Sequence, residues 1–201
     1  DFNLNSIKSL EAAKADTHII PFNPPKATYT GDAGFSLDFQ LPQGRNGIQP
    51  AMTLGYSSAA GSGILGKGFD INYGSMICID TRKSLPLYNE NDVYMLDGIL
   101  LQQVNKTGTY IEYEPLKQTG YQTIRRYNAW SSEGFDYWEI TSANGVKSIY
   151  GQTADSTVGS KDRIFAWYLT SVQDFLGNSI KYEYFKDSNY VYPDKINYTG
   201  F

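Results

Sequence analysis

The chain has 201 residues, enough for a substantial hydrophobic core, and matches one domain or one structural unit of a larger assembly. Aromatic residues make up 15% of it, with 17 tyrosines beside 19 glycines, and this mixture favours pleated strands joined by tight turns. The net charge of −4 argues against a nucleic-acid surface, the single cysteine excludes an intrachain disulfide, and no apolar run approaches the roughly 20 residues of a membrane span.

The first 29 residues are expected to form a segment separate from the rest of the chain. A helically spaced apolar pattern with a serine cap predicts a short helix over residues 5–15. The prolines of residues 21–25 cannot continue a helix or a central strand, so that stretch predicts an extended connector. We therefore divide the chain into an N-terminal segment, residues 1–29, and a β domain, residues 30–201.

A glycine-rich stretch is the most distinctive part of the sequence. Apolar and polar residues alternate over residues 35–41, which predicts a strand with one buried face. Further strands are predicted over residues 51–56 and 69–73, and the glycines between them suit turns and close backbone approach. We expect structural roles for the glycines, prolines and Arg-Asn-Gly turn of this motif, which are Gly34, Pro42, Gly44, Arg45, Asn46, Gly47, Pro50, Gly61, Gly63, Gly66 and Gly68.

Consecutive antiparallel hairpins are predicted for the remainder of the chain. Asp97-Gly98 and Asn144-Gly145 suit the positive-φ positions of type I′ turns. The polar stretch over residues 153–162 predicts a surface loop. The expected fold is all-β and mostly antiparallel, and a sandwich is one such arrangement.

The glycine-rich motif and several later pieces resemble a known family. The pieces, in chain order, are residues 34–36, 41–50, 54–58, 61–69, 91–98, 138–151 and 167–184. They look like the amino-terminal region of the Salmonella virulence plasmid B protein (SpvB) family, which also opens the B component of insecticidal Tc toxins. The resemblance covers residues 30–201, with Phe69 where the family has tryptophan, and residues 169–184 are similar to the tyrosine-aspartate hairpin repeats of Rhs proteins.

This resemblance implies a function. It implies a non-catalytic segment of a secreted or cell-surface, toxin-related protein, in which this region helps to wall a hollow β shell around a toxic polypeptide. The implied partners are the remainder of a longer chain with Rhs-type repeats, and a toxin C-type component or a carrier protein. No nucleic acid and no cofactor is implied.

Residues for catalysis or metal binding are sparse. His18 is the only histidine and Cys78 the only cysteine, so neither a histidine-based triad nor a zinc site is expected. Cys78 lies in an apolar run and is expected to act as a small hydrophobe. Glu112 and Glu114 share one face of a predicted strand, but such pairs are common in β-proteins, and spacing in the sequence does not show whether two carboxylates lie at the distance that glycoside hydrolysis needs.

Aromatic residues leave one alternative open. Trp130, Tyr137 and Trp138 could form an exposed platform that stacks on sugars or peptides, which would make the chain a carbohydrate- or protein-binding module. Core packing is the competing interpretation, and the adjacent Tyr137 and Trp138 must point to opposite faces of a strand. The basic pair Arg125-Arg126 is expected to be a solvated strand end or part of a structural ion pair.

Overall fold

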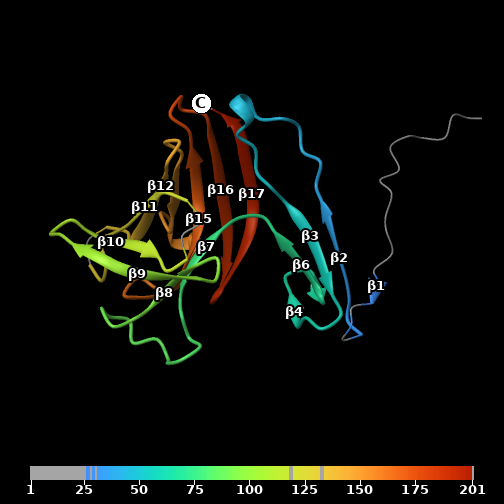
Figure 1. The fold of residues 1–201 in the computed structure, drawn as a ribbon, viewed down its shortest axis with the longest axis horizontal. Coiled ribbons are helices and arrows are strands. Elements are labelled where there is room, and N and C mark those ends of the chain that lie inside the picture. The colour runs from blue at the N-terminus through green and yellow to red at the C-terminus, as the bar shows by residue number, and fades with distance from the viewer. Residues whose placement is uncertain (1–25, 28, 30, 118–119, 132–133, 201) are drawn as a thin grey trace, which may run out of the picture.

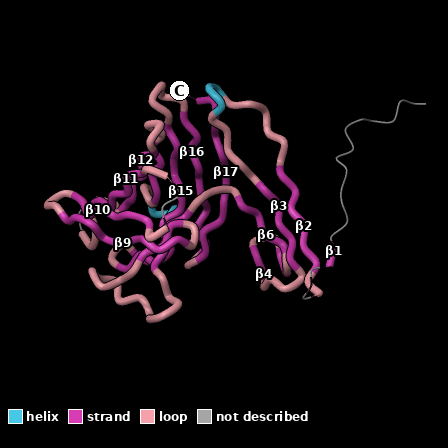
Figure 2. Tube along the Cα trace, viewed as in Figure 1, coloured by secondary structure: helices cyan, strands magenta, loops and turns pink. Residues whose placement is uncertain are grey.

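The computed structural model describes residues 26–27, 29, 31–117, 120–131 and 134–200, and in this part the chain is all-β with antiparallel pairing (Figures 1 and 2). No helix among these residues reaches seven residues, and none is long and apolar enough to cross a membrane. Short 3-10 turns occur at η2 (Arg45–Gly47) and η3 (Ala154–Ser156). The helix expected over residues 5–15 lies outside the described residues.

Four strands form a small sheet at the start of the described chain. Their order is β1 (Lys26–Ala27), β2 (Ala33–Asp38), β3 (Thr53–Ser57) and β6 (Phe69–Asn72), and the ribbon of β4 (Ser62–Gly63) and β5 (Gly66–Lys67) connects β3 to β6. Phe35, Tyr56 and Phe69 are cross-strand neighbours whose ring centroids lie 4.6–6.2 Å apart. The predicted alternation holds for Phe35 and Leu37, which give this sheet one apolar face, but Phe39 is exposed and lies beyond the end of β2.

The rest of the chain forms one large sheet. Its strands are β7 (Met76–Ile79), β8 (Tyr94–Leu96), β9 (Ile99–Lys106), β10 (Tyr110–Pro115), β11 (Gln122–Tyr127), β12 (Tyr137–Ser142), β13 (Lys147–Tyr150), β14 (Thr157–Ser160), β15 (Arg163–Gln173), β16 (Ser179–Asp187) and β17 (Tyr190–Gly200). Consecutive neighbours pair from β7 to β13, and β15 pairs with both β7 and β13. Eight strands thus close into a barrel, and β16 and β17 extend the sheet beyond it.

Strand β15 is the branch point between the barrel and this extension. One of its edges pairs first with β14 and then with β13. The other edge pairs with β7 through Ala166, Trp167 and Tyr168, and then with β16 from Ser171 onward. The β16–β17 hairpin therefore leaves the ring where β7 ends and runs beside the small sheet (Figure 1).

Large aromatic and branched side chains fill the barrel. An eight-stranded ring has an interior just wide enough for side chains to fill it. The fully or almost fully buried side chains are Ile77, Ile79, Tyr94, Ile124, Trp138 and Trp167. Trp138 lies against Tyr94 and Trp167 with centroid distances of 5.2 and 5.8 Å.

Two expectations are corrected by this arrangement. The described strands do not form a sandwich, because β13 pairs with β15 and closes one sheet on itself. Strand alternation fixes which face is buried, but it does not fix whether distant strands pair. Residues 153–162 are not simply a loop, since they contain η3 and β14, and Ser156 and Thr157 are buried.

The barrel interior should dominate stability. Ile124→Ala is expected to lower the free energy of unfolding by about 2–5 kcal/mol, because it leaves a cavity in a fully buried site. Val104→Ala on the exposed part of β9 is the matched control and should change it by less than about 1 kcal/mol. Urea unfolding followed by tryptophan fluorescence measures both, and equal losses would contradict the assigned core.

Candidate functional site

The glycine-rich motif forms the junction between the two sheets. Its loop between β2 and β3 contains Asn46, whose φ of 52° turns the chain so that the side-chain Nδ2 donates to Asp174 Oδ2 at 3.0 Å. The Tyr198 hydroxyl on β17 donates to the Pro42 carbonyl at 3.1 Å. Two contacts from this loop thus hold the small sheet beside the β15–β17 part of the large one.

Glycine is required in the motif where backbone segments approach closely. A Cβ on Gly44 would lie 1.7 Å from the Ile48 carbonyl oxygen, and one on Gly63 would lie 2.2 Å from that of Phe69. The other motif residues are distributed over the same unit: Gly34 on β2; Pro42, Arg45, Asn46, Gly47 and Pro50 between β2 and β3; and Gly61, Gly66 and Gly68 in or beside the β4–β5 ribbon. None of them forms a catalytic arrangement with the others.

Asp174 holds the turn that receives this loop. Its carboxylate accepts hydrogen bonds from the backbone N–H groups of Leu176 and Asn178, both at 2.9 Å, and from Asn178 Nδ2 at 2.8 Å. The hydrogen bond from Asn178, followed by that from Asn46, lowers the pKa of the Asp174 carboxyl below its ordinary value. The two segments that meet here are 128 residues apart, and no signal in either one predicts the contact.

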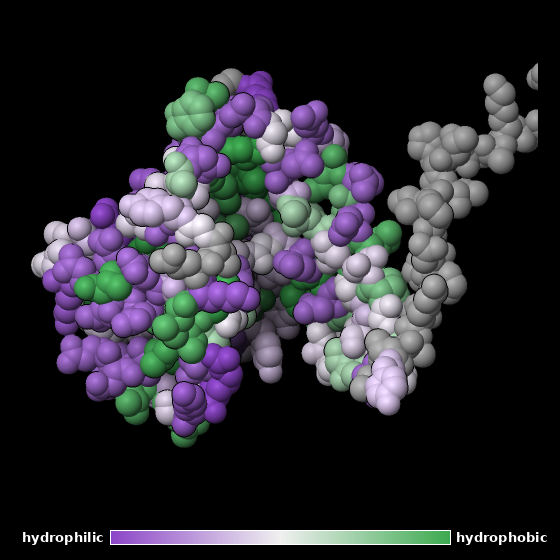
Figure 3. Space-filling model, viewed as in Figure 1, coloured by the Kyte–Doolittle hydropathy of each residue, from purple (hydrophilic) through white to green (hydrophobic). Residues whose placement is uncertain are grey.

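A cleft of about 1020 Å³ lies between the two sheets, and the space-filling view shows the hollow there (Figure 3). One wall comes from β3, the β4–β5 ribbon and β6. The opposite wall and floor carry Tyr73, Tyr168, Tyr182, Tyr190 and Tyr192. Apart from the high tyrosine content, nothing in the sequence predicts that these tyrosines line one cleft.

The aromatic residues singled out from the sequence do not form a shared platform. Trp138 is 0% exposed inside the barrel, so it has no face open to a ligand. Its neighbour Tyr137 points to the outer face and stacks on Tyr127 at 5.0 Å. Trp130 is half-buried with its ring over Arg126. The opposite orientations of Tyr137 and Trp138 follow from strand geometry, as expected.

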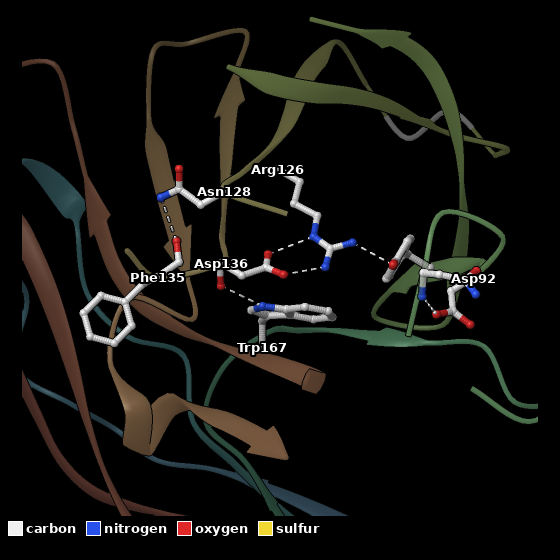
Figure 4. A network of polar contacts seen from close by, with 8 residues as sticks. Asp92, Arg126, Asn128, Phe135, Asp136 and Trp167 are labelled. Atoms are coloured by element: carbon white, nitrogen blue, oxygen red, sulfur yellow. Dashed lines mark hydrogen bonds and ion pairs between the residues drawn. The ribbon is translucent and has the colours of Figure 1, made fainter. Parts of the chain in front are cut away.

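Arg126 forms a buried ion pair inside the barrel (Figure 4). Its Nε donates to Asp136 Oδ1 at 2.8 Å and its Nη2 to Oδ2 at 2.5 Å, while Nη1 donates to the Tyr94 hydroxyl at 2.6 Å. Trp167 Nε1 donates to the Asp136 carbonyl oxygen at 2.8 Å. These contacts connect β11, β8 and β15 with the segment that leads into β12.

Aromatic rings surround the Arg126 charge. The guanidinium carbon lies 4.7–5.4 Å from the ring centroids of Tyr94, Trp130, Trp138 and Trp167. Burial disfavours the charged form, but hydrogen bonds and charge from Asp136 outweigh it and raise the pKa of Arg126. Arg125 points outward to Glu112, so only Arg126 of the basic pair belongs to a buried ion pair.

Strand β17 is the open edge of the large sheet. It pairs with β16 over its length, and among the described residues no strand pairs with its other side. The register shifts at two places, so Asp194, which follows Pro193, and Thr199, which has a φ of 68°, bulge out of the ladder. Proline and charged residues at a bulge are common means of limiting unwanted pairing at an edge.

No grouping of three or more His, Cys, Asp or Glu side chains suited to a metal ion occurs in the part of the chain that the structure describes. The Cys78 thiol is half-buried, and burial is the main cause that raises its pKa. Of the two carboxylates weighed for hydrolysis, Glu112 is paired with Arg125 at 3.5 Å and Glu114 is exposed.

Comparison with known proteins places the chain among toxin-related sequences. The family model described as SpvB, the Salmonella virulence plasmid 65kDa B protein, matches residues 27–198. A curated relative, the mono(ADP-ribosyl)transferase SpvB of Salmonella enteritidis, is 25% identical over 98% of this chain. The chain spans only 37% of the length of that relative.

Solved structures share the fold. The N-terminal domain of effector protein SpvB from Salmonella typhimurium aligns with a TM-score of 0.70 and 23% identity, covering 81% of this chain and 63% of that one. The Tc holotoxin pore of Photorhabdus luminescens, determined with a TccC3 mutation, aligns with a TM-score of 0.75 and 21% identity. That alignment covers 89% of this chain and 10% of the holotoxin chain.

The buried ion pair gives a stability test. Asp136→Ala is expected to lower the free energy of unfolding by about 3–5 kcal/mol, because it leaves the Arg126 charge buried without its partner. Lys147→Ala, which breaks a partly exposed pair with Glu139, is the control and should cost less than about 1 kcal/mol. Replacing both Arg126 and Asp136 by apolar residues should restore part of the loss in urea unfolding. A double variant no more stable than Asp136→Ala would contradict this account.

The Asp174 junction gives a pH test. Because the folded pKa of Asp174 is lowered, its contribution to stability is present above the unfolded pKa and is lost as the pH falls through the folded value. Asp174→Asn should therefore flatten the loss of stability as the pH falls below about 5 in urea unfolding. Asp155→Asn, an exposed carboxylate elsewhere, should leave that slope unchanged. Identical slopes for the wild type and Asp174→Asn would show that the junction is not energetically coupled to folding.

Proposed function

Because the chain belongs to the SpvB family, we propose that it is a non-catalytic structural segment of a secreted, toxin-related protein. In this proposal it opens the wall of a β shell that holds a toxic polypeptide until release. The transferase activity named for its curated relatives belongs to whole proteins of which the chain spans 37%, so it is not assigned here.

The open edge of β17 carries the proposal. This strand has 11 residues and is long enough to continue the sheet, yet its outer side has no strand beside it in the described chain. Exposed edges of this length readily accept another strand. The barrel would then serve as a closed end from which the wall extends.

The chemistry of β17 limits where a further strand pairs. Pro193 has no N–H to donate, and Asp194 bulges out of the ladder. Pairing is therefore expected along residues 195–198, between the two bulges and beside the contact with the motif loop. The partner strand would come from the remainder of a longer chain with Rhs-type repeats.

A C-type component is the proposed partner of the assembled protein. The fold of this chain recurs in a Tc holotoxin pore that carries TccC3, which supports such an assembly for the parent protein. A carrier protein that binds the shell is the other proposed partner. Both would act on the assembled shell outside the cell or at its surface.

A binding module is the second candidate function. It is favoured by the closed barrel, which gives the domain a core of its own, and by the tyrosine-lined cleft. In that case β17 would stay an edge, and the cleft would carry the function.

Hydrogen exchange distinguishes these functions. The amides of residues 195–198 that point away from β16 should exchange quickly in the 201-residue chain and at least tenfold more slowly in the natural full-length protein, because a paired amide is protected. Amides of β12 are the internal control, since they lie within the closed ring and should be slow in both. Equally fast exchange of these outward-pointing amides in both proteins would overturn the shell-wall proposal.

A further inference from the structure

The cleft between the two sheets contains tyrosine hydroxyls that the fold leaves without partners. Tyr73 and Tyr182 are only 7% and 8% exposed, and both line the cleft together with the half-buried Tyr168. Within the described residues none of these three hydroxyls makes a hydrogen bond. Among the described residues, the buried side-chain polar atoms without a partner are Arg125 Nε and Trp138 Nε1, so the three tyrosine hydroxyls are open to the cleft. Several hydroxyls that converge on one aromatic-lined cleft point to a ligand.

Other buried tyrosines of the same protein show the contrast. Tyr184 donates to the Leu169 carbonyl, and Tyr150 donates to the Ser75 hydroxyl at 3.2 Å. Arg126 donates to the Tyr94 hydroxyl inside the barrel. The fold therefore satisfies its tyrosines elsewhere, and the lack of partners is a property of the cleft.

The negative charge of the cleft favours a positively charged ligand. Its lining includes the carboxylates of Asp70 and Asp97 and contains no lysine or arginine among the described residues. Burial is the main cause that raises the pKa of Tyr73 and Tyr168, and the negative charge of Asp70 adds to both shifts. A cation would gain from these carboxylates and from the faces of the tyrosine rings.

From these observations we propose that the cleft binds an extended polypeptide segment through its lysine or arginine side chains. Its volume of about 1020 Å³ lies at the upper end of the roughly 300–1,000 Å³ of small-molecule pockets, which suits an elongated ligand. The peptide backbone supplies acceptors for the free tyrosine hydroxyls, and the basic side chains lie between Asp70 and the rings. A neutral oligosaccharide could use the hydroxyls but would gain nothing from the charge.

This site is independent of the shell-wall proposal, because all of its residues lie in the described chain and none depends on pairing at residues 195–198. The exchange experiment above and the binding experiment below can therefore fail separately.

The test uses the 201-residue chain and an immobilised library of random heptapeptides. Lysine and arginine are expected to be enriched among bound peptides, and binding of the best one should weaken as salt rises. For that peptide, Tyr182→Phe should reduce affinity about two- to tenfold through loss of one hydrogen bond. Asp70→Asn should reduce it about two- to fivefold.

Matched controls separate the cleft from general surface charge. Tyr121→Phe and Asp155→Asn remove the same groups from exposed positions outside the cleft and should leave affinity unchanged. Selection of peptides without a basic preference would overturn the proposal. Equal losses of affinity in the cleft variants and the control variants would also overturn it. So would competition for the bound peptide by neutral oligosaccharides but not by arginine peptides. Circular dichroism of each variant confirms that it is folded.

Discussion

Pairing between β13 and β15 is the constraint on which the rest of the structure depends. It joins the two ends of a run of consecutive hairpins and turns an open sheet into a ring with an interior that must be filled. Trp138 and Trp167 are fully buried in that space, and the Arg126 charge is tolerated there because Asp136 and four aromatic rings replace its water. Closure also leaves the β16–β17 hairpin outside the ring, where it extends the sheet as an overhang.

The overhang and the motif loop together create the surfaces on which the proposed functions rest. Asn46 and Pro42 hold the small sheet beside the hairpin through hydrogen bonds with Asp174 and Tyr198. Among the described residues no strand of one sheet pairs with a strand of the other, and the cleft lies between them. Without the close approach at Gly44, the loop could not take its observed path, because any side chain there would overlap the Ile48 carbonyl. The glycine-rich motif thus contributes to the contact with the large sheet through its loop, and not only through the strands of the small sheet.

Local features of the fold were predictable, and long-range ones were not. Alternation over residues 35–41 predicted a strand, and β2 occupies Ala33–Asp38. Asp97-Gly98 forms a turn with positive φ at both residues, as predicted, whereas at Asn144-Gly145 only the glycine has positive φ. Barrel closure was missed because pairing between distant strands leaves no trace in residue periodicity. The cleft was missed for a related reason, since its tyrosines come from four separate elements and the alternation within each strand does not show which hydroxyls lack a partner. The aromatic platform was sought around Trp138, which lies in the core instead.

We propose that the large sheet continues beyond β17 in the parent protein, and a cryo-electron microscopy structure of the natural full-length protein would show whether it does. The eight-stranded ring is expected to be unchanged, with a new strand against β17 along residues 195–198. A map in which β17 remains at the edge, with its outer side facing solvent, would rule out a shared wall.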